Sequence, residues 1–151
     1  MVLLSVVEIE AMTPEQRLGI IKLDIFPLSA GFPMVILTCT NLKVLHLYSS
    51  MVTSIPREIE NLVNLKILYF ITNNLTSIPR ELGNMVNLDW LSLASNELTS
   101  IPRELANLVN LRTPLPYPIK MDFYMTTGET IDRVVGANTF SDLGRLCARF
   151  F

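Results

Sequence analysis

Few residues of this chain have side chains suited to catalysis. It has one histidine, His46, and two cysteines, Cys39 and Cys147. A thiol beside an imidazole can act as a nucleophile, but His46 falls in an early segment and Cys147 near the chain end. The sequence holds no G-x-S-x-G, no glycine-rich phosphate loop and no H-E-x-x-H. We therefore expect no enzyme, with no catalytic, cofactor-binding or metal-binding residue. A small hydrolase that uses Cys147 stays as the alternative.

The composition argues against several other classes of protein. Half of the 151 residues are hydrophobic and 17% are charged, which favours a folded domain with a sizeable core. The net charge of -2 argues against nucleic acid, because binding phosphates needs a concentrated basic face. No apolar run approaches the ~18 residues of a membrane span, and the start lacks the basic region of a secretory signal. The two cysteines are not clustered, so we expect a cytoplasmic protein.

Internal repetition is the dominant feature of the sequence. The segments 41–63, 64–86 and 87–109 align without a gap at a period of 23 residues. Eleven columns are identical in all three copies. They begin at Asn41, Leu42, Leu45, Thr53, Ser54, Ile55, Pro56, Arg57, Glu58, Asn61 and Val63.

Each copy predicts a strand, a turn and a short helix. Leu45 and Leu47 are two residues apart, the period of a strand with one buried face. Ser50, Asn73 and Asn96 follow as turn residues, whose side chains can bond free backbone groups from copy to copy. Because Ser50 can do this only in part, we expect the first turn to be the loosest. The prolines Pro56, Pro79 and Pro102 are placed at the first helical position, followed by glutamates that favour the helix start.

The pattern L-x-x-L-x-L-x-x-N-x-L-T-S-I-P-x-E-L-x-N-L-x-N resembles the leucine-rich repeat family. The 23-residue period with I-P-x-E is most similar to the intracellular, Ras-group type, over residues 41–112. The resemblance implies an α/β solenoid, a right-handed superhelix with short parallel strands on its concave face and short helices on its convex face. It also implies a protein partner, in some members within small-GTPase signalling.

The flanks fit the repeat less well. We assign residues 1–40 to an N-terminal cap and a degenerate first repeat, with a helix starting at Thr13. Leu18, Ile21 and Leu23 take the slots of L-x-x-L-x-L, and Phe32-Pro33, Ile36 and Cys39 take the later slots after one inserted residue. The alternative is an irregular hydrophobic leader.

Residues 41–112 hold the three full repeats and the start of a fourth. Pro114 and Pro116 replace the strand leucines of that fourth copy, so the sheet should stop there. Residues 113–151 are then a C-terminal cap, with a short helix after Ser141 that folds back over the last repeat. An interaction tail for a separate partner is the alternative.

The side chains that alternate with the buried leucines should form one apolar and aromatic surface on the concave face. Such surfaces mark interfaces, and Tyr69 and Trp90 are the types that carry most binding energy. The alternative is that the flanks cover this face and make it core. The predicted protein-binding residues are Val44, His46, Tyr48, Ile67, Tyr69, Ile71, Trp90, Ser92 and Ala94.

One position is arginine in all three copies, and a glutamate follows it each time. We call Arg57, Arg80 and Arg103 the arginine column. An electrostatic strip for an acidic partner is one interpretation. We favour a solvated ladder of Arg and Glu pairs between stacked repeats, worth ~0–1 kcal/mol each.

Three functions are consistent with the sequence. The first is a scaffold or adaptor that binds another protein, with a small GTPase or another signalling component as the implied partner. The second is a targeting or structural fragment of a larger protein whose activity lies in a partner or a missing domain. The third is the hydrolase named above.

Overall fold

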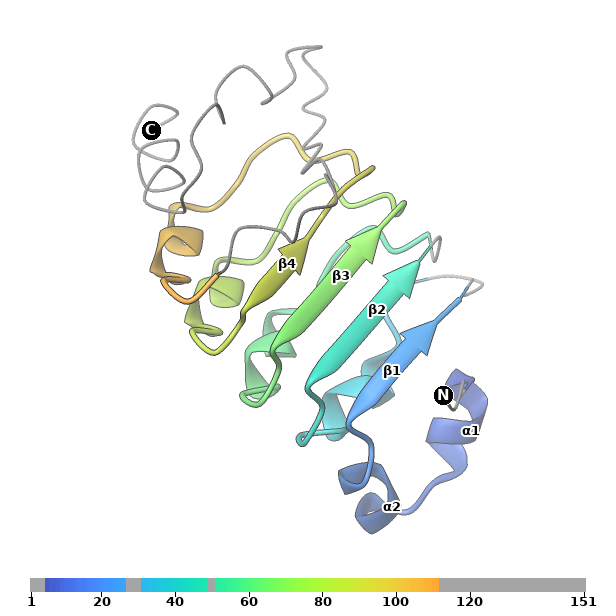
Figure 1. Ribbon diagram of the computed structural model, residues 1–151. Coiled ribbons are helices and arrows are strands. Elements are labelled where there is room, and N and C mark those ends of the chain that lie inside the picture. The colour runs from blue at the N-terminus through green and yellow to red at the C-terminus, as the bar shows by residue number, and fades with distance from the viewer. Residues whose placement is uncertain (1–4, 27–30, 49–50, 112–151) are drawn as a thin grey trace, which may run out of the picture.

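The computed structural model of the chain describes residues 5–26, 31–48 and 51–111. Its centre is one parallel sheet with strands in chain order, and each strand is followed by a 3-10 helix behind the sheet (Figure 1). The strands are β1 (Lys22–Ile25), β2 (Val44–Tyr48), β3 (Ile67–Ile71) and β4 (Trp90–Ser92). The helices are η1 (Met34–Thr38), η2 (Arg57–Asn61), η3 (Arg80–Asn84) and η4 (Arg103–Asn107).

The strands stack with their leucines in register. Leu45 lies opposite Leu68, and Leu68 lies opposite Leu91. In β2 and β3 buried residues alternate with partly exposed ones, because successive side chains of a strand point to opposite faces. The inward leucines of neighbouring repeats form one shared core, as the 23-residue period predicts.

The prediction for the prolines was wrong by one position. Pro56, Pro79 and Pro102 are extended residues that precede the helices, and do not occupy the first helical turn. Each contributes its carbonyl oxygen as the first acceptor; that of Pro56 accepts from the backbone N–H of Ile59 at 3.1 Å. The helices are 3-10 helices of five residues, because only a few residues separate each proline from the bend into the next strand.

Buried asparagines join consecutive turns, as the sequence predicts. The amide nitrogen of Asn96 donates to the carbonyl of Phe70 at 2.6 Å, and its oxygen accepts from the N–H of Leu75 at 3.1 Å. Asn73 makes the same two links to Leu47 and Val52. Each asparagine therefore bonds a backbone carbonyl and a backbone N–H of the preceding repeat and ties the two turns together.

A second, exposed series of asparagines lies where the chain bends into the strands. Asn41 donates to the carbonyl of Leu18 at 3.0 Å, one unit earlier along the chain. The same bond is made by Asn64, Asn87 and Asn110, to the carbonyls of Thr40, Val63 and Val86. This series explains why the Asn41 column is identical in every copy.

Two short helices precede the sheet. They are α1 (Val6–Ala11) and α2 (Pro14–Leu18), each with a capping box at its start. The helix predicted to begin at Thr13 is α2, and Thr13 is its N-cap. The Arg17 side chain ties the two together by donating to the carbonyls of Ile9 and Glu10, at 3.0 and 2.9 Å.

The strand slots predicted before residue 26 were wrong by two residues. Leu23 lies opposite Leu45 and Ile25 opposite Leu47, while Leu18 and Ile21 are about half exposed. Leu18 is the last residue of α2, so the strand can begin only after it. Leu23 and Ile36 are 13 residues apart and Leu45 and Ile59 are 14 apart, so this unit has one residue fewer, not one more.

Some predictions concern residues outside the described ranges. They are the looseness of the turn at Ser50, the end of the sheet at Pro114 and Pro116, and the cap or tail at 113–151.

Candidate functional site

The candidate site is the side of the sheet that faces away from the helices; we call it the sheet face. All of its predicted residues are partly exposed except Ser92, which is buried. Ala94 follows the end of β4, and its carbonyl accepts from the N–H of Thr72 beside β3. The described part of the sheet face has three rows across the strands. The first is Lys22, Val44, Ile67 and Trp90, and the second is Asp24, His46, Tyr69 and Ser92. The third is Tyr48 and Ile71, extended past the strand ends by Phe26, which stacks on Tyr48, and by Ala94.

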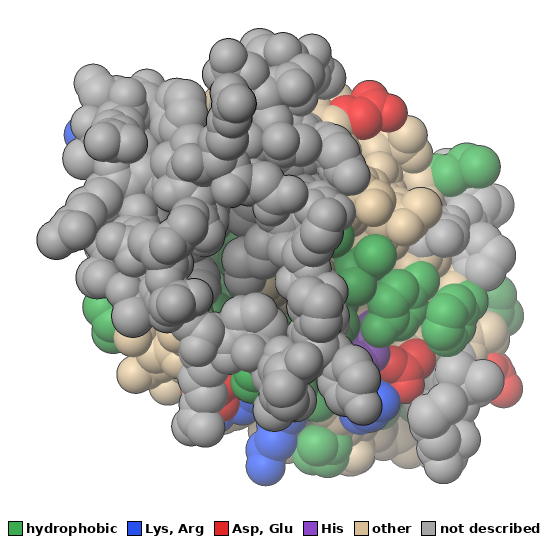
Figure 2. Space-filling model, turned by 45° about the horizontal axis from the view of Figure 1, so that its top comes forward, with side chains coloured by type: hydrophobic (Ala, Val, Ile, Leu, Met, Phe, Trp, Pro, Cys, Tyr) green, Lys and Arg blue, Asp and Glu red, His purple; other side chains and the backbone are tan. Residues whose placement is uncertain are grey.

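Aromatic rings connect neighbouring strands on this surface. His46 stacks on Tyr69, with 4.7 Å between ring centroids and 8° between planes. Tyr48 meets His46 edge-on at 5.5 Å and stacks on Phe26 at 5.2 Å. Hydrophobic side chains gather on one side of the histidine, and acidic and basic side chains lie on another (Figure 2). These contacts hold the rings in fixed positions, which lowers the entropy that a partner would have to remove on binding.

The middle row is polar. The Nδ1 atom of His46 lies 2.6 Å from the carboxylate of Asp24, and the other carboxylate oxygen lies 3.2 Å from the ammonium of Lys22. Asp24 is buried, with 8% of its side chain exposed. Burial lowers the pKa of His46 below its usual value, against the opposing hydrogen bond and charge of Asp24. The imidazole is therefore neutral at pH 7.

Burial also acts on the tyrosines of the sheet face. It raises the pKa of Tyr48 above its usual value, and the charge of Asp24 and the neighbouring Tyr69 add to this effect. Burial raises the pKa of Tyr69 as well. Both phenols are therefore uncharged at physiological pH, so the aromatic part of the surface carries no charge of its own.

Asp24 and Phe26 were missing from the sequence prediction of the site. Asp24 stands between Leu23 and Ile25 as His46 stands between Leu45 and Leu47, and this alternation was the signal that could have identified it. Phe26 is 54% exposed and continues the same alternation past the end of β1.

The polar row does not assemble a nucleophile. Ser92 and His46 belong to strands separated by β3, which puts them about 9.5 Å apart at the usual strand spacing, with Tyr69 between them. Cys39 lies in the core, where burial raises the pKa of its thiol. Cys147 lies outside the described residues. Across the described ranges, no group of three metal-binding side chains is present and no helix could cross a membrane.

The arginine column lies away from the sheet face. Arg57, Arg80 and Arg103 are each at least three-quarters exposed, and each pairs with the glutamate that follows it. The nitrogen to oxygen distances are 3.1, 3.3 and 3.6 Å. The prediction of ion pairs between stacked repeats was wrong. Each guanidinium pairs with the next residue of its own helix, and not with a glutamate of the neighbouring repeat.

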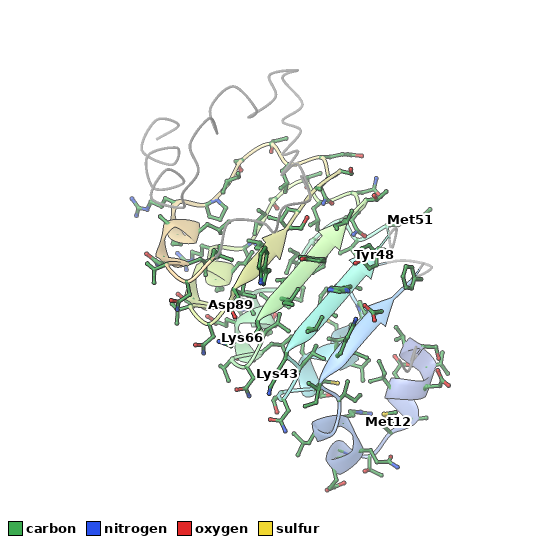
Figure 3. The ribbon with its side chains drawn as sticks, in the orientation of Figure 1. Met12, Lys43, Tyr48, Met51, Lys66 and Asp89 are labelled. Atoms are coloured by element: carbon green, nitrogen blue, oxygen red, sulfur yellow. The ribbon has the colours of Figure 1, made fainter. Side chains whose placement is uncertain are left out.

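Charged side chains also lie along the edge of the sheet where the strands begin. Lys43, Lys66 and Asp89 directly precede β2, β3 and β4 (Figure 3). Together with Lys22, they lie beside the apolar side chains of Val44, Ile67 and Trp90. The charged groups named on the sheet face thus lie on the edge strand β1 and where the strands begin, and the rings of Tyr69 and Trp90 lie inside this margin, the arrangement usual for protein interfaces.

Comparison with known proteins agrees with the fold. A family model of the leucine-rich repeat matches residues 87–108. A search of curated proteins found no match. Among solved structures, a leucine-rich repeat protein of Leptospira interrogans is 35% identical, with a TM-score of 0.55 over 61% of this chain and 24% of that one. An internalin of Listeria monocytogenes is 32% identical, with a TM-score of 0.57 over 67% of this chain and 29% of that one.

A third similar structure was solved with a partner. It is the leucine-rich repeat ectodomain of the Arabidopsis thaliana membrane receptor kinase GASSHO1/SCHENGEN3, in complex with CASPARIAN STRIP INTEGRITY FACTOR 2. It is 31% identical, with a TM-score of 0.60 over 69% of this chain and 13% of that one. This chain spans less than a third of the length of each of the three proteins. The predicted fold is confirmed: the chain is a leucine-rich repeat solenoid.

Proposed function

We propose that this chain is a non-enzymatic module that binds another protein through its sheet face. The observation that carries the proposal is the register of the strands, which collects one tryptophan, two tyrosines and a histidine on one surface. Each comes from a different repeat or a different row, so only the stacked solenoid presents them together. Large rings held in place give much contact area at a low entropy cost, which favours a protein or peptide ligand.

The similar structures support this class of function. The ectodomain of GASSHO1/SCHENGEN3 was solved in complex with CASPARIAN STRIP INTEGRITY FACTOR 2, and the plant peptide hormone receptor RGFR1 was solved in complex with RGF2. For this chain we propose an extended segment of another protein as the ligand. Its apolar side chains would lie on the row of Val44, Ile67 and Trp90 and on the row of Tyr48 and Ile71.

The cellular role is a further part of the proposal. The similarity of the repeats to the Ras-group type supports an adaptor in cytoplasmic signalling, with a small GTPase or another signalling protein as partner. The free Cys39 thiol in the core is compatible with a reducing compartment. The short span relative to similar proteins supports a second candidate, a targeting or structural fragment of a longer leucine-rich repeat protein.

The test is capture of partners by the full chain, followed by direct binding of each purified candidate. The wild type is compared with the double variant Tyr69→Ala, Trp90→Ala and with the matched control Arg80→Ala, Arg103→Ala, which changes two exposed residues on the helix side. A purified partner should bind the wild type and the control equally and the double variant at least tenfold more weakly.

Circular dichroism and thermal unfolding establish that all three proteins are folded. A folded double variant that binds every captured partner as tightly as the wild type would refute the sheet face as the binding site. Purified small GTPases, loaded with GDP or with a GTP analogue, test the proposed partner class in the same assay.

A further inference from the structure

Two lysines at the edge of the sheet face differ from the other basic residues; we call Lys43 and Lys66 the lysine pair. Both are exposed, and within the described ranges neither side chain forms an ion pair or a hydrogen bond. Every other lysine or arginine of these ranges bonds a carboxylate or a backbone carbonyl. They are Arg17, Lys22, Arg57, Arg80 and Arg103.

The backbone holds the lysine pair side by side. The N–H of Lys66 donates to the carbonyl of Lys43 at 2.8 Å, and the N–H of Asp89 donates in the same way to the carbonyl of Lys66 at 2.8 Å. All three residues lie along the edge where the strands begin (Figure 3). Because neighbouring strands are about 4.8 Å apart, the two ammonium groups repel each other, and a carboxylate placed between them is attracted to both.

The positive charge is limited to two strands. On the side of β1, the ammonium of Lys22 is already paired with the carboxylate of Asp24 at 3.2 Å. On the side of β4, the column of the lysine pair continues with Asp89, an acidic residue in place of a lysine. The place for an acidic group of a ligand is therefore the start of β2 and β3.

Apolar side chains adjoin the lysine pair on the sheet face. Val44 follows Lys43 and Ile67 follows Lys66, and Val44 lies opposite Ile67, which lies opposite Trp90. Covering these apolar side chains supplies affinity, whereas charges at their margin select which partners approach. All three are only partly exposed, so a segment can lie on them, but they do not project far enough to insert into a bilayer.

We infer that the sheet face binds an extended acidic segment of another protein, in which carboxylates at every second position contact Lys43 and Lys66. The inference deepens the proposed function and rests on it. Alternate side chains of an extended segment point to opposite sides, so the residues between the carboxylates face the apolar side chains and the rings. Carboxylates two residues apart are separated by about 6.7 Å, and the flexible lysine stems span the difference from the strand spacing.

Two displayed libraries of 12-residue peptides test the inference. Both have apolar and aromatic residues at every second position. The positions between them are restricted to Asp and Glu in one library and to Lys and Arg in the other. Selection on the full chain should yield binders from the acidic library and none from the basic library. Equal recovery from the two libraries would overturn the inference.

Variants of the chain locate the carboxylates of a selected acidic peptide. Lys43→Glu, Lys66→Glu should weaken binding at least about tenfold, because each position then repels the group that it attracted. The control Arg80→Glu, Arg103→Glu changes the net charge by the same amount on the helix side, and should change the Kd by less than about threefold. An equal loss in the control would show that net charge, and not the lysine pair, governs binding.

Rates and salt dependence separate the lysine pair from the rings. Charges at the margin of an interface mainly speed association, whereas well-packed side chains mainly slow dissociation. Lys43→Gln, Lys66→Gln should therefore associate more slowly, and its Kd should depend less on NaCl between about 50 and 500 mM than that of the wild type. Tyr69→Ala, Trp90→Ala should dissociate faster. Equal salt dependence in the wild type and the glutamine variant would contradict the inference.

The outcomes distinguish the two proposals. If the selected peptides bind Tyr69→Ala, Trp90→Ala as tightly as the wild type, the proposed function itself is wrong. If they need those rings but bind Lys43→Glu, Lys66→Glu equally well, the sheet face binds proteins and the role of the lysine pair is overturned.

Vesicles of phosphatidylcholine with about 30% phosphatidylserine test an anionic membrane as the ligand instead. The wild type should not bind them. Binding that is lost in Lys43→Glu, Lys66→Glu would assign the lysine pair to a membrane surface and overturn the inference. Thermal unfolding of each variant confirms that it is folded.

Discussion

The imidazole of His46 lies parallel to the ring of Tyr69, with 4.7 Å between the centroids, and these two residues occupy the same position in consecutive repeats. The stack covers one face of the imidazole and removes it from water. It thus links the repeat architecture directly to the protonation of the chain's one histidine.

The first prediction is that Tyr69 and Asp24 shift the pKa of His46 in opposite directions. Tyr69→Ala should raise it, because water regains access to the ring and burial is what lowers it most. Asp24→Asn should lower it further, because the charge that favours the imidazolium is lost. Since the chain has one histidine, its ring proton signals in NMR give the pKa without assignment. Shifts in the same direction would contradict this account.

The same pKa predicts how stability depends on pH. The folded pKa lies below the unfolded value of about 6.5, so the unfolded chain binds more protons between the two values. The contribution of His46 is therefore full above about pH 6.5 and is lost as pH falls toward the folded pKa. Urea unfolding at pH 7.5 and 5.5 should show a drop in the wild type that is smaller in His46→Gln.

A second prediction concerns the buried asparagines. Asn96→Ala should lower the free energy of unfolding by about 2–4 kcal/mol, because it leaves the carbonyl of Phe70 and the N–H of Leu75 without partners. Asn87→Ala is the matched control: it removes one exposed bond, to Val63, and should cost no more than about 1 kcal/mol. Denaturant unfolding measures both, and equal losses would contradict the role given to the buried series.

A third prediction concerns the close packing of η3 on η4. A Cβ at Gly83 would collide with the backbone carbonyl of Glu104, which cannot rotate away. Gly83→Ala should therefore cost about 1–3 kcal/mol of stability, as overpacking usually does. Ala106→Ser, at the exposed equivalent position in η4, should stay within about 0.5 kcal/mol of the wild type. A Gly83→Ala variant as stable as the wild type would show that the helices separate easily.

A fourth prediction concerns the arginine column. The triple reversal Arg57→Glu, Arg80→Glu, Arg103→Glu should change the Kd for a sheet-face partner by less than about threefold, because exposed ion pairs contribute little. Isothermal titration with the wild type and the triple variant measures the change. A loss of tenfold or more would favour the alternative, an electrostatic strip for an acidic partner.

The repeats made most of the fold predictable. Eleven identical columns determine the period, and the alternation of Leu45 and Leu47 determines which face is buried, so the register of β2 to β4 follows from the sequence. The first unit was harder, because Leu18, Ile21 and Leu23 have the same spacing as the buried Ile20, Leu23 and Ile25. The end of α2 at Leu18 distinguishes the two sets, because the strand unit can begin only after that helix.

The polar row was less predictable than the strands that carry it. Its central contact joins residues 22 apart, one fewer than the period, because the first unit is one residue shorter. The sequence prediction did not include Asp24. Its register, two residues out of step, keeps the same face outward but would set Asp24 opposite Tyr48, whereas the structure sets it opposite His46. The contact depends on the register of β1 against β2. The degenerate first repeat does not show that register in its sequence, because two sets of apolar residues have the same spacing.

Oxidative footprinting of the chain, free and bound to a captured partner, tests the central claim most directly. Hydroxyl radicals modify exposed aromatic and methionine side chains, and Met34 in η1 is 54% exposed on the helix side. We predict that Tyr69 and Trp90 lose reactivity when the partner binds, while Met34 keeps its own. Unchanged reactivity of both rings, or protection of Met34 instead, would show that the partner binds elsewhere.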